Sequence, residues 1–254
     1  MTSSEKGSNP HGHFSELLKV EGKLALREPY GLFGIAFPVV LLVLIWFVGT
    51  LNPGNVEGTS YTVLDLYIPT IMVIGFITIA FGLPNGLVRD REIGWLRRIS
   101  TTPVHPSRLL AAQMVLNLIF AFIMILIVVF GGEVIFGAAL NVNIPLFVVS
   151  IVLSIGVIFS LGLVVAAIAP SQTAASALGG VFFMGMLFLS GLWVQPVMVG
   201  GALATVMYYS PAGAAVQALL YSVFNSAVPY TALATMVVYT ALFAFVAIRY
   251  FRWE

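Results

Sequence analysis

The side chains that could do chemistry gather in one short stretch, residues 88–103. Within ten consecutive positions it carries six charged residues: Arg89, Asp90, Arg91, Glu92, Arg97 and Arg98. In a helical register Arg91, Trp95 and Arg98 share one face, because they are spaced i, i+4 and i+7. A short amphipathic helix of this kind is suited to gripping a partner protein. The alternative, which composition alone favours, is a charged loop at the lipid surface that fixes the topology.

No other group of residues is arranged for catalysis or metal binding. The chain has no cysteine, and its three histidines are His11, His13 and His105, which lack the further ligands of a metal site. The phosphate-binding pattern Gly-x-x-x-x-Gly-Lys-Ser/Thr is absent, because the Gly22-Lys23 pair is followed by leucine and has no glycine at the upstream position. A net charge of +1 gives no electrostatic footprint for nucleic acid. We therefore expect no catalytic residue, metal, bound cofactor or nucleic-acid partner.

Composition places these residues in a membrane. The chain of 254 residues is 60% hydrophobic and 8% charged, whereas soluble domains carry about 25% charged residues. Long apolar runs, each able to cross ~30 Å of hydrocarbon as a helix, predict six spans at residues 31–51, 64–88, 107–132, 145–169, 173–192 and 228–249. The runs lack the alternation of outer-membrane strands, which excludes a β-barrel.

Residues 193–227 are apolar but interrupted. Gly200-Gly201 and Ser210-Pro211 divide them into pieces too short to cross alone, which predicts a re-entrant helical hairpin before the last span. The alternative is one kinked crossing from Val197 to Phe224, which would make seven spans.

The distribution of basic residues favours six spans. All eleven Lys and Arg fall before the first span, between the second and third, or at the C-terminal end. Six spans place all of them on one side, which the positive-inside rule makes the cytoplasm, with both termini there. Between Leu109 and Ile248 the only charged residue is Glu133, which disfavours a carrier driven by an ion gradient. Asp65 and Glu133 are expected near the outer interface, where water reaches them.

The first 30 residues are predicted to form a cytoplasmic tail and an amphipathic helix. Lys19, Lys23 and Arg27 recur every four residues, so that a helix would present one basic stripe to anionic head groups of the inner leaflet. The alternative is a solvated helix face. Residues 31–254 then form the transmembrane domain, with a cytoplasmic loop at about 88–107.

Two segments resemble the ABC-2 type transporter permeases, the membrane subunits of a class of ABC exporters. The first is Asp-Arg-Glu-Ile-Gly-Trp-Leu at residues 90–96, followed by Thr101-Thr102-Pro103. The second is Phe-Leu-Ser-Gly-Leu-Trp-Val-Gln-Pro at residues 188–196, followed by Tyr-Ser-Pro-Ala-Gly at 209–213. The six-span layout and the hairpin before the last span agree, so the resemblance covers nearly the whole chain.

The resemblance implies an all-α permease subunit in a prokaryotic plasma membrane. It would pair with a second copy or a related permease and dock two ATPase subunits, which would bind ATP and Mg²⁺ and do the hydrolysis that this chain does not. The docking residues implied are Asp90, Arg91, Glu92, Gly94, Trp95, Leu96 and Arg98. The second and fifth spans would border the substrate path, with candidates Phe76, Thr78, Phe81, Phe182, Phe183 and Met186, although packing in the core or against lipid explains the same residues.

The resemblance favours export of an amphipathic drug or antibiotic, as in multidrug efflux and antibiotic resistance. Export of a lipid or glycan conjugate by the same mechanism stays open, because no residue selects among these substrates. A membrane anchor that recruits a cytoplasmic partner without transporting anything is the alternative from another class.

Overall fold

The computed structural model describes residues 22, 29–51, 53–56, 60–92, 106–224 and 226–250, and over these the chain is all-helical. Within these ranges six helices are long and apolar enough to span a membrane, as the sequence predicted. They are α2 (Pro29–Leu51), α3 (Val63–Glu92), α5 (Pro106–Phe130), α6 (Ile144–Ile168), α7 (Gln172–Leu189) and α11 (Tyr230–Tyr250). A single π-helical turn, η1 (Gly131–Ile135), extends α5.

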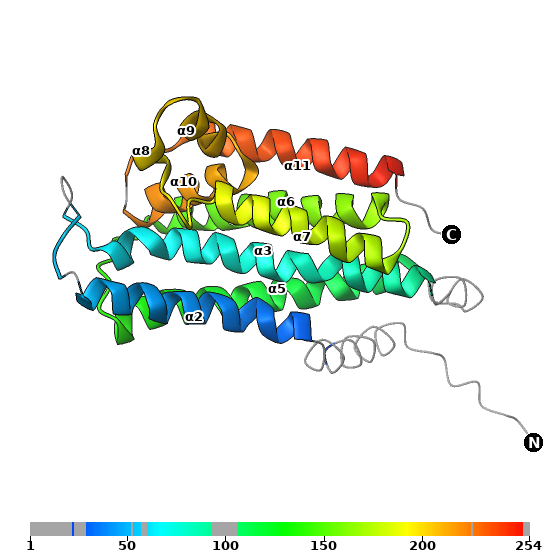
Figure 1. Cartoon of the computed structure of the whole chain (residues 1–254), viewed down its shortest axis with the longest axis horizontal. Coiled ribbons are helices and arrows are strands. Elements are labelled where there is room, and N and C mark those ends of the chain that lie inside the picture. Colours follow the sequence, from blue (N-terminus) through cyan, green and yellow to red (C-terminus); the bar gives the residue numbers. More distant parts are fainter. Residues whose placement is uncertain are drawn as a thin grey trace, which may run out of the picture.

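Helix α3 occupies the centre of the bundle. Every residue from Ile68 to Ala80 is buried, because α2 and α5 pack on one side of α3 and α6 and α7 on the other (Figure 1). Helix α11 packs along α6 at the periphery. The C-terminal end of α3, the α6–α7 turn and the C-terminal end of α11 lie at one end of the bundle (Figure 1), which we call the basic end because Arg89, Arg91 and Arg249 are there.

The central helix is longer than its apolar run. Helix α3 continues through Glu92, so residues 89–92 extend a spanning helix and do not begin a separate one. The prolines inside it, Pro69 and Pro84, do not end it. Membrane helices tolerate proline because neighbouring helices satisfy the freed backbone groups.

Residues 196–223 form three short helices: α8 (Pro196–Val199), α9 (Gly201–Tyr208) and α10 (Pro211–Val223). Gly200 and Gly201 have φ of +67° and +59°, a region that glycine adopts without strain, and they separate α8 from α9. No single helix therefore runs from Val197 to Phe224. Helix α10 packs against α3, α6 and α11 at the end opposite the basic end (Figure 1). Its re-entrant position in a membrane stays a prediction.

Asp65 is buried, contrary to the expectation that water reaches it; its exposed fraction is 2%. Its carboxylate accepts hydrogen bonds from the Thr62 backbone N–H at 2.7 Å, the Thr62 hydroxyl at 2.8 Å and the Ala139 N–H at 2.9 Å. The Thr62 hydroxyl in turn accepts from the Asp65 N–H at 3.3 Å. This reciprocal cap satisfies the backbone N–H groups of Thr62 and Asp65 at the start of α3, and it ties the loop after η1 to the same point.

The turn from α9 to α10 depends on Gly213. A Cβ there would lie 1.9 Å from the Met207 carbonyl oxygen, and backbone atoms cannot move aside as a flexible side chain would. The Ser210 hydroxyl holds the same turn, accepting from the Gly213 N–H at 3.0 Å and donating to the Met207 carbonyl at 2.7 Å.

We expect Gly213→Ala to destabilise the protein by about 2–3 kcal/mol, because the clash forces the turn open. Gly49→Ala is the matched control, since a Cβ there has no neighbour within 4 Å. Thermal unfolding of the purified chain in detergent measures both. Equal midpoints for the two variants would contradict the tight turn.

Candidate functional site

The basic end holds a clamp between three helices. The Arg91 guanidinium donates to the carbonyl of Ala169, the residue that ends α6. The Glu92 carboxylate accepts from the Gln172 N–H, the first residue of α7, at 2.9 Å. The backbone groups at helix termini have no partners within their own helix. Because Pro170 ends α6, that helix cannot provide a donor for the Ala169 carbonyl. The last turn of α3 thus supplies partners for both ends of the α6–α7 turn.

The clamp continues into a line of contacts between α3 and α7. The Ser176 hydroxyl donates to the Asn85 side-chain oxygen at 2.7 Å. A Cβ on Gly179 would lie 2.9 Å from the Phe81 ring, so α7 approaches α3 closely only because residue 179 lacks a side chain. We call these contacts, Glu92–Gln172, Asn85–Ser176 and Phe81–Gly179, the α3–α7 seam. The helices run antiparallel along it (Figure 1).

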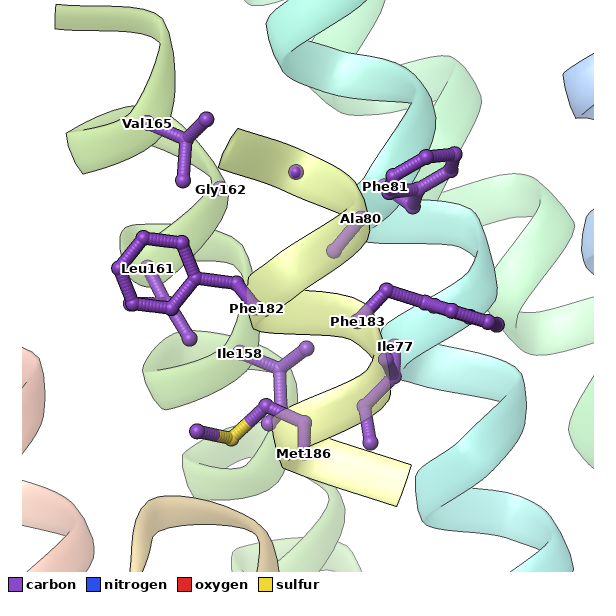
Figure 2. A pocket seen from close by; sticks show the side chains of 11 residues that line it. Ile77, Ala80, Phe81, Ile158, Leu161, Gly162, Val165, Phe182, Phe183 and Met186 are labelled. Atoms are coloured by element: carbon purple, nitrogen blue, oxygen red, sulfur yellow. The ribbon is translucent and has the colours of Figure 1, made fainter. Parts of the chain in front are cut away.

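The seam ends at an apolar groove formed by α3, α6 and α7 (Figure 2). Every residue that lines it is apolar: Ile77, Ala80, Phe81, Ile158, Leu161, Gly162, Val165, Gly179, Phe182, Phe183 and Met186. Its volume is about 30 Å³, whereas sites for drug-sized molecules measure about 300–1,000 Å³. In this conformation the groove is therefore closed to such a molecule.

Phe183 is the centre of an aromatic cluster that joins α7 to α2 and α3. Its ring centroid lies 5.3 Å from that of Phe81, 6.3 Å from Phe33 and 6.4 Å from Phe37. The last two rings stack on each other at 5.1 Å. The sequence analysis missed Phe33 and Phe37, whose four-residue spacing places them on one helix face but does not say which helix they meet.

Four of the six residues predicted for the substrate path line the apolar groove, and the other two, Phe76 and Thr78, do not. Phe81, Phe182, Phe183 and Met186 line the groove. Phe76 is fully buried in the core, and the Thr78 hydroxyl donates to the Gly75 carbonyl at 2.8 Å and the Gly34 carbonyl at 3.2 Å, which ties α3 to α2.

The predicted docking and lipid-binding residues are described only in part. Arg91 and Glu92 form the clamp, and Asp90 is in the last turn of α3. The remaining ones lie outside the described residues: Gly94, Trp95, Leu96, Arg98, Lys19, Lys23 and Arg27. Across the part of the chain that is described, no three His, Asp or Glu side chains gather as metal ligands.

Comparison with known protein families shows to which family the chain belongs. The family model described as ABC-2 type transporter matches residues 13–224, which is most of the sequence, so the chain belongs to the ABC-2 type transporter family. No curated protein matches it. Family membership and the six apolar helices together make it a multi-pass membrane component of an ABC transport system, a component that partners with ABC ATPase subunits.

We expect Glu92→Ala to speed hydrogen exchange at the Gln172 amide by about tenfold, because the amide loses a charged acceptor. Glu92→Gln retains an oxygen at that place and should have a smaller effect. Exchange in peptides that cover the α6–α7 turn measures both variants, with Glu133→Ala at the opposite end of the bundle as the control. Unchanged protection of Gln172 in Glu92→Ala would show that the clamp does not form.

Proposed function

We propose that this ABC-2 type transporter is the permease subunit of an ATP-driven exporter that moves an amphipathic, drug-like or antibiotic-like molecule out of a prokaryotic cell. Two copies, or this chain and a related permease, would enclose the path, and two ATPase subunits would dock at the basic end. The observation that supports this most is the α3–α7 seam, because it joins the charged end of α3 to an apolar groove.

The chemistry of the groove suits an amphipathic cargo. Aromatic rings and a methionine thioether make contacts that adapt to different apolar shapes, and Phe182, Phe183 and Met186 all come from α7. Because the groove holds only about 30 Å³, a substrate enters it only when α7 separates from α3 and α6. We infer that α7 is the helix that moves.

The seam offers a route from the ATPase to that helix. A push on residues 93–100 acts first on the last turn of α3, where Arg91 and Glu92 hold the α6–α7 turn. The displacement reaches α7 at Gln172 and Ser176, which lie before the groove residues on the same helix. Hydrogen bonds carry this force, because α7 contains no charged residue that could form an ion pair with α3.

The orientation follows from charge. The basic end would face the cytoplasm, because loops rich in Lys and Arg stay inside. Both termini would then be cytoplasmic, and the α8–α10 segment would lie at the outer face. Energy would enter at the inner face, and the cargo would leave at the other.

Purification of the chain with candidate ABC ATPases tests this proposal. We expect a stable complex whose ATP hydrolysis rises when an amphipathic drug is added. Trp95→Ala should weaken docking of the ATPase and leave membrane insertion intact, whereas Trp193→Ala is the control. Docking without transport in vesicles would favour the anchor, and stimulation by lipid-linked glycans alone would favour export of those conjugates.

Gly179→Ala tests the groove separately from docking. The added methyl group meets the Phe81 ring at 2.9 Å and so displaces a groove wall. We expect normal ATPase binding and basal hydrolysis, with at least about a fivefold loss of stimulation by substrate, because one misplaced contact in a pocket is worth about 1–3 kcal/mol. Gly185→Ala on the same helix, where nothing lies within 4 Å, should keep full stimulation. Full stimulation in Gly179→Ala as well would place the path elsewhere.

A further inference from the structure

A second pocket is lined by residues of α9, α10 and the start of α11. These elements lie at the end of the bundle opposite the basic end (Figure 1). We call it the tyrosine pocket; its lining residues are Tyr208, Tyr209, Gln217, Leu220, Tyr221, Thr231, Ala232 and Thr235. Its volume is about 410 Å³, within the range of small-molecule sites. It is therefore large enough to hold a ligand in the conformation described, unlike the apolar groove.

The polar groups of this pocket are all uncharged. Its lining residues include three tyrosines, two threonines and one glutamine, whose hydroxyl and amide groups can donate and accept hydrogen bonds. The Thr235 hydroxyl already donates to the Thr231 carbonyl at 2.8 Å. The hydroxyls of Tyr208, Tyr209 and Tyr221 bond to no residue in the described part of the chain, and no buried side-chain oxygen or nitrogen there lacks a partner. These three hydroxyls are consequently accessible and available to a ligand.

Gln217 is held in place by the backbone. Its side-chain nitrogen donates to the Tyr208 carbonyl at 2.9 Å and to the Gly213 carbonyl at 3.5 Å. These two bonds fix the side-chain amide, and no described residue donates to its oxygen, which is left as an acceptor for a ligand. A fixed acceptor among hydroxyl groups selects a ligand that donates from hydroxyls of its own.

The helices around the pocket offer no cation to pair with an anionic headgroup. Residues 134–248 contain no Asp, Glu, Lys, Arg or His, so a phosphate or carboxylate in the pocket would have no cationic partner from these helices. Burying an unpaired charge is strongly unfavourable. Tyrosine offers an apolar ring beside a polar tip, which matches a sugar or polyol with its C–H faces and hydroxyl edges.

The pocket continues into an apolar stripe on α11. Thr231, Thr235, Val238, Leu242 and Phe245 follow one another at steps of four and three residues, which places them on one helix face. The first two line the pocket, and the last three have exposed fractions of 65%, 50% and 67%. A polar pocket next to an exposed apolar stripe is complementary to an amphiphile, whose headgroup would occupy the pocket and whose chains would lie along α11.

We propose that the tyrosine pocket binds a membrane amphiphile with an uncharged, hydroxyl-rich headgroup, of the glycolipid class. The site belongs to one chain, and it shares no lining residue with the apolar groove. It requires neither an ATPase nor transport, so it stands whether or not the proposed function is correct.

Binding to the full chain in phosphatidylcholine nanodiscs tests the site, with monogalactosyl diacylglycerol as the probe. We expect this lipid to bind saturably and to be displaced neither by phosphatidylglycerol, whose headgroup has hydroxyls but also a charge, nor by free galactose at the same concentration. Displacement by phosphatidylglycerol would overturn the selection against charge. Equal affinity for free galactose would overturn the role of the stripe, and inability to bind the lipid at all would overturn the site.

Two pairs of variants locate the binding. Tyr209→Phe combined with Tyr221→Phe retains both rings and removes two hydroxyls, and we expect at least about fivefold weaker binding. Tyr230→Phe is the matched control, because Tyr230 is exposed on α11 but does not line the pocket. Leu242→Ala should weaken binding more than Val237→Ala, which lies off the stripe. Unchanged binding in the double tyrosine variant would refute the assignment of the headgroup to this pocket.

Discussion

Burial of α3 on all sides is the constraint on which the rest of this bundle depends. Every residue from Ile68 to Ala80 is buried, as are Asp65 and Asn85, so the polar groups at these positions need partners in the protein. Thr78 finds one in α2, Asn85 in α7, and Asp65 in the loop after η1. Each of these bonds satisfies a polar group and also fixes a neighbouring element, so the polar residues of α3 set the positions of the helices around it.

At both ends of α3, charged side chains are hydrogen-bonded to backbone groups that lack a helical partner. At its first turn a carboxylate accepts from N–H groups that have no helical partner, and at its last turn Arg91 and Glu92 serve the ends of two other helices. The Asp65 carboxylate is stable there because three hydrogen bonds from the protein compensate for its desolvation. Between these ends, α3 and α6 pack closely. A Cβ on Gly162 of α6 would lie only 3.0 Å from the Ala80 carbonyl oxygen, so the approach depends on the absence of a side chain there.

Hydropathy predicted the six spans because crossing a bilayer is a local property of about 20 consecutive residues. The contacts that make the site are not local: Glu92 meets Gln172, Asn85 meets Ser176, and Asp65 meets Ala139 across 74 or more residues of chain. That Asp65 lies near the outer interface stays a prediction, whereas its hydration was wrong, since nothing in the neighbouring sequence indicates that it bonds to the Ala139 N–H and is buried. Phe76 and Phe81 both lie in the apolar run of α3, so the sequence does not distinguish them. The packing of α7 against α3 makes Phe81 a groove residue, whereas Phe76 is buried in the core.

The type of contact between α3 and α7 changes along the α3–α7 seam, and this change bears on the proposed movement of α7. Near the basic end α7 is held to α3 by hydrogen bonds at Gln172 and Ser176, which are directional and resist sliding. Beyond Gly179 the contacts to α3 are between rings and aliphatic side chains, which attract without a fixed direction. Val181 and Met184 are exposed on the other side of α7, at 72% and 61%. Hydrogen bonds at the first turns of α7 and dispersion contacts to α3 farther along fit the proposed separation of α7 from α3, because the groove lies along the part without hydrogen bonds to α3.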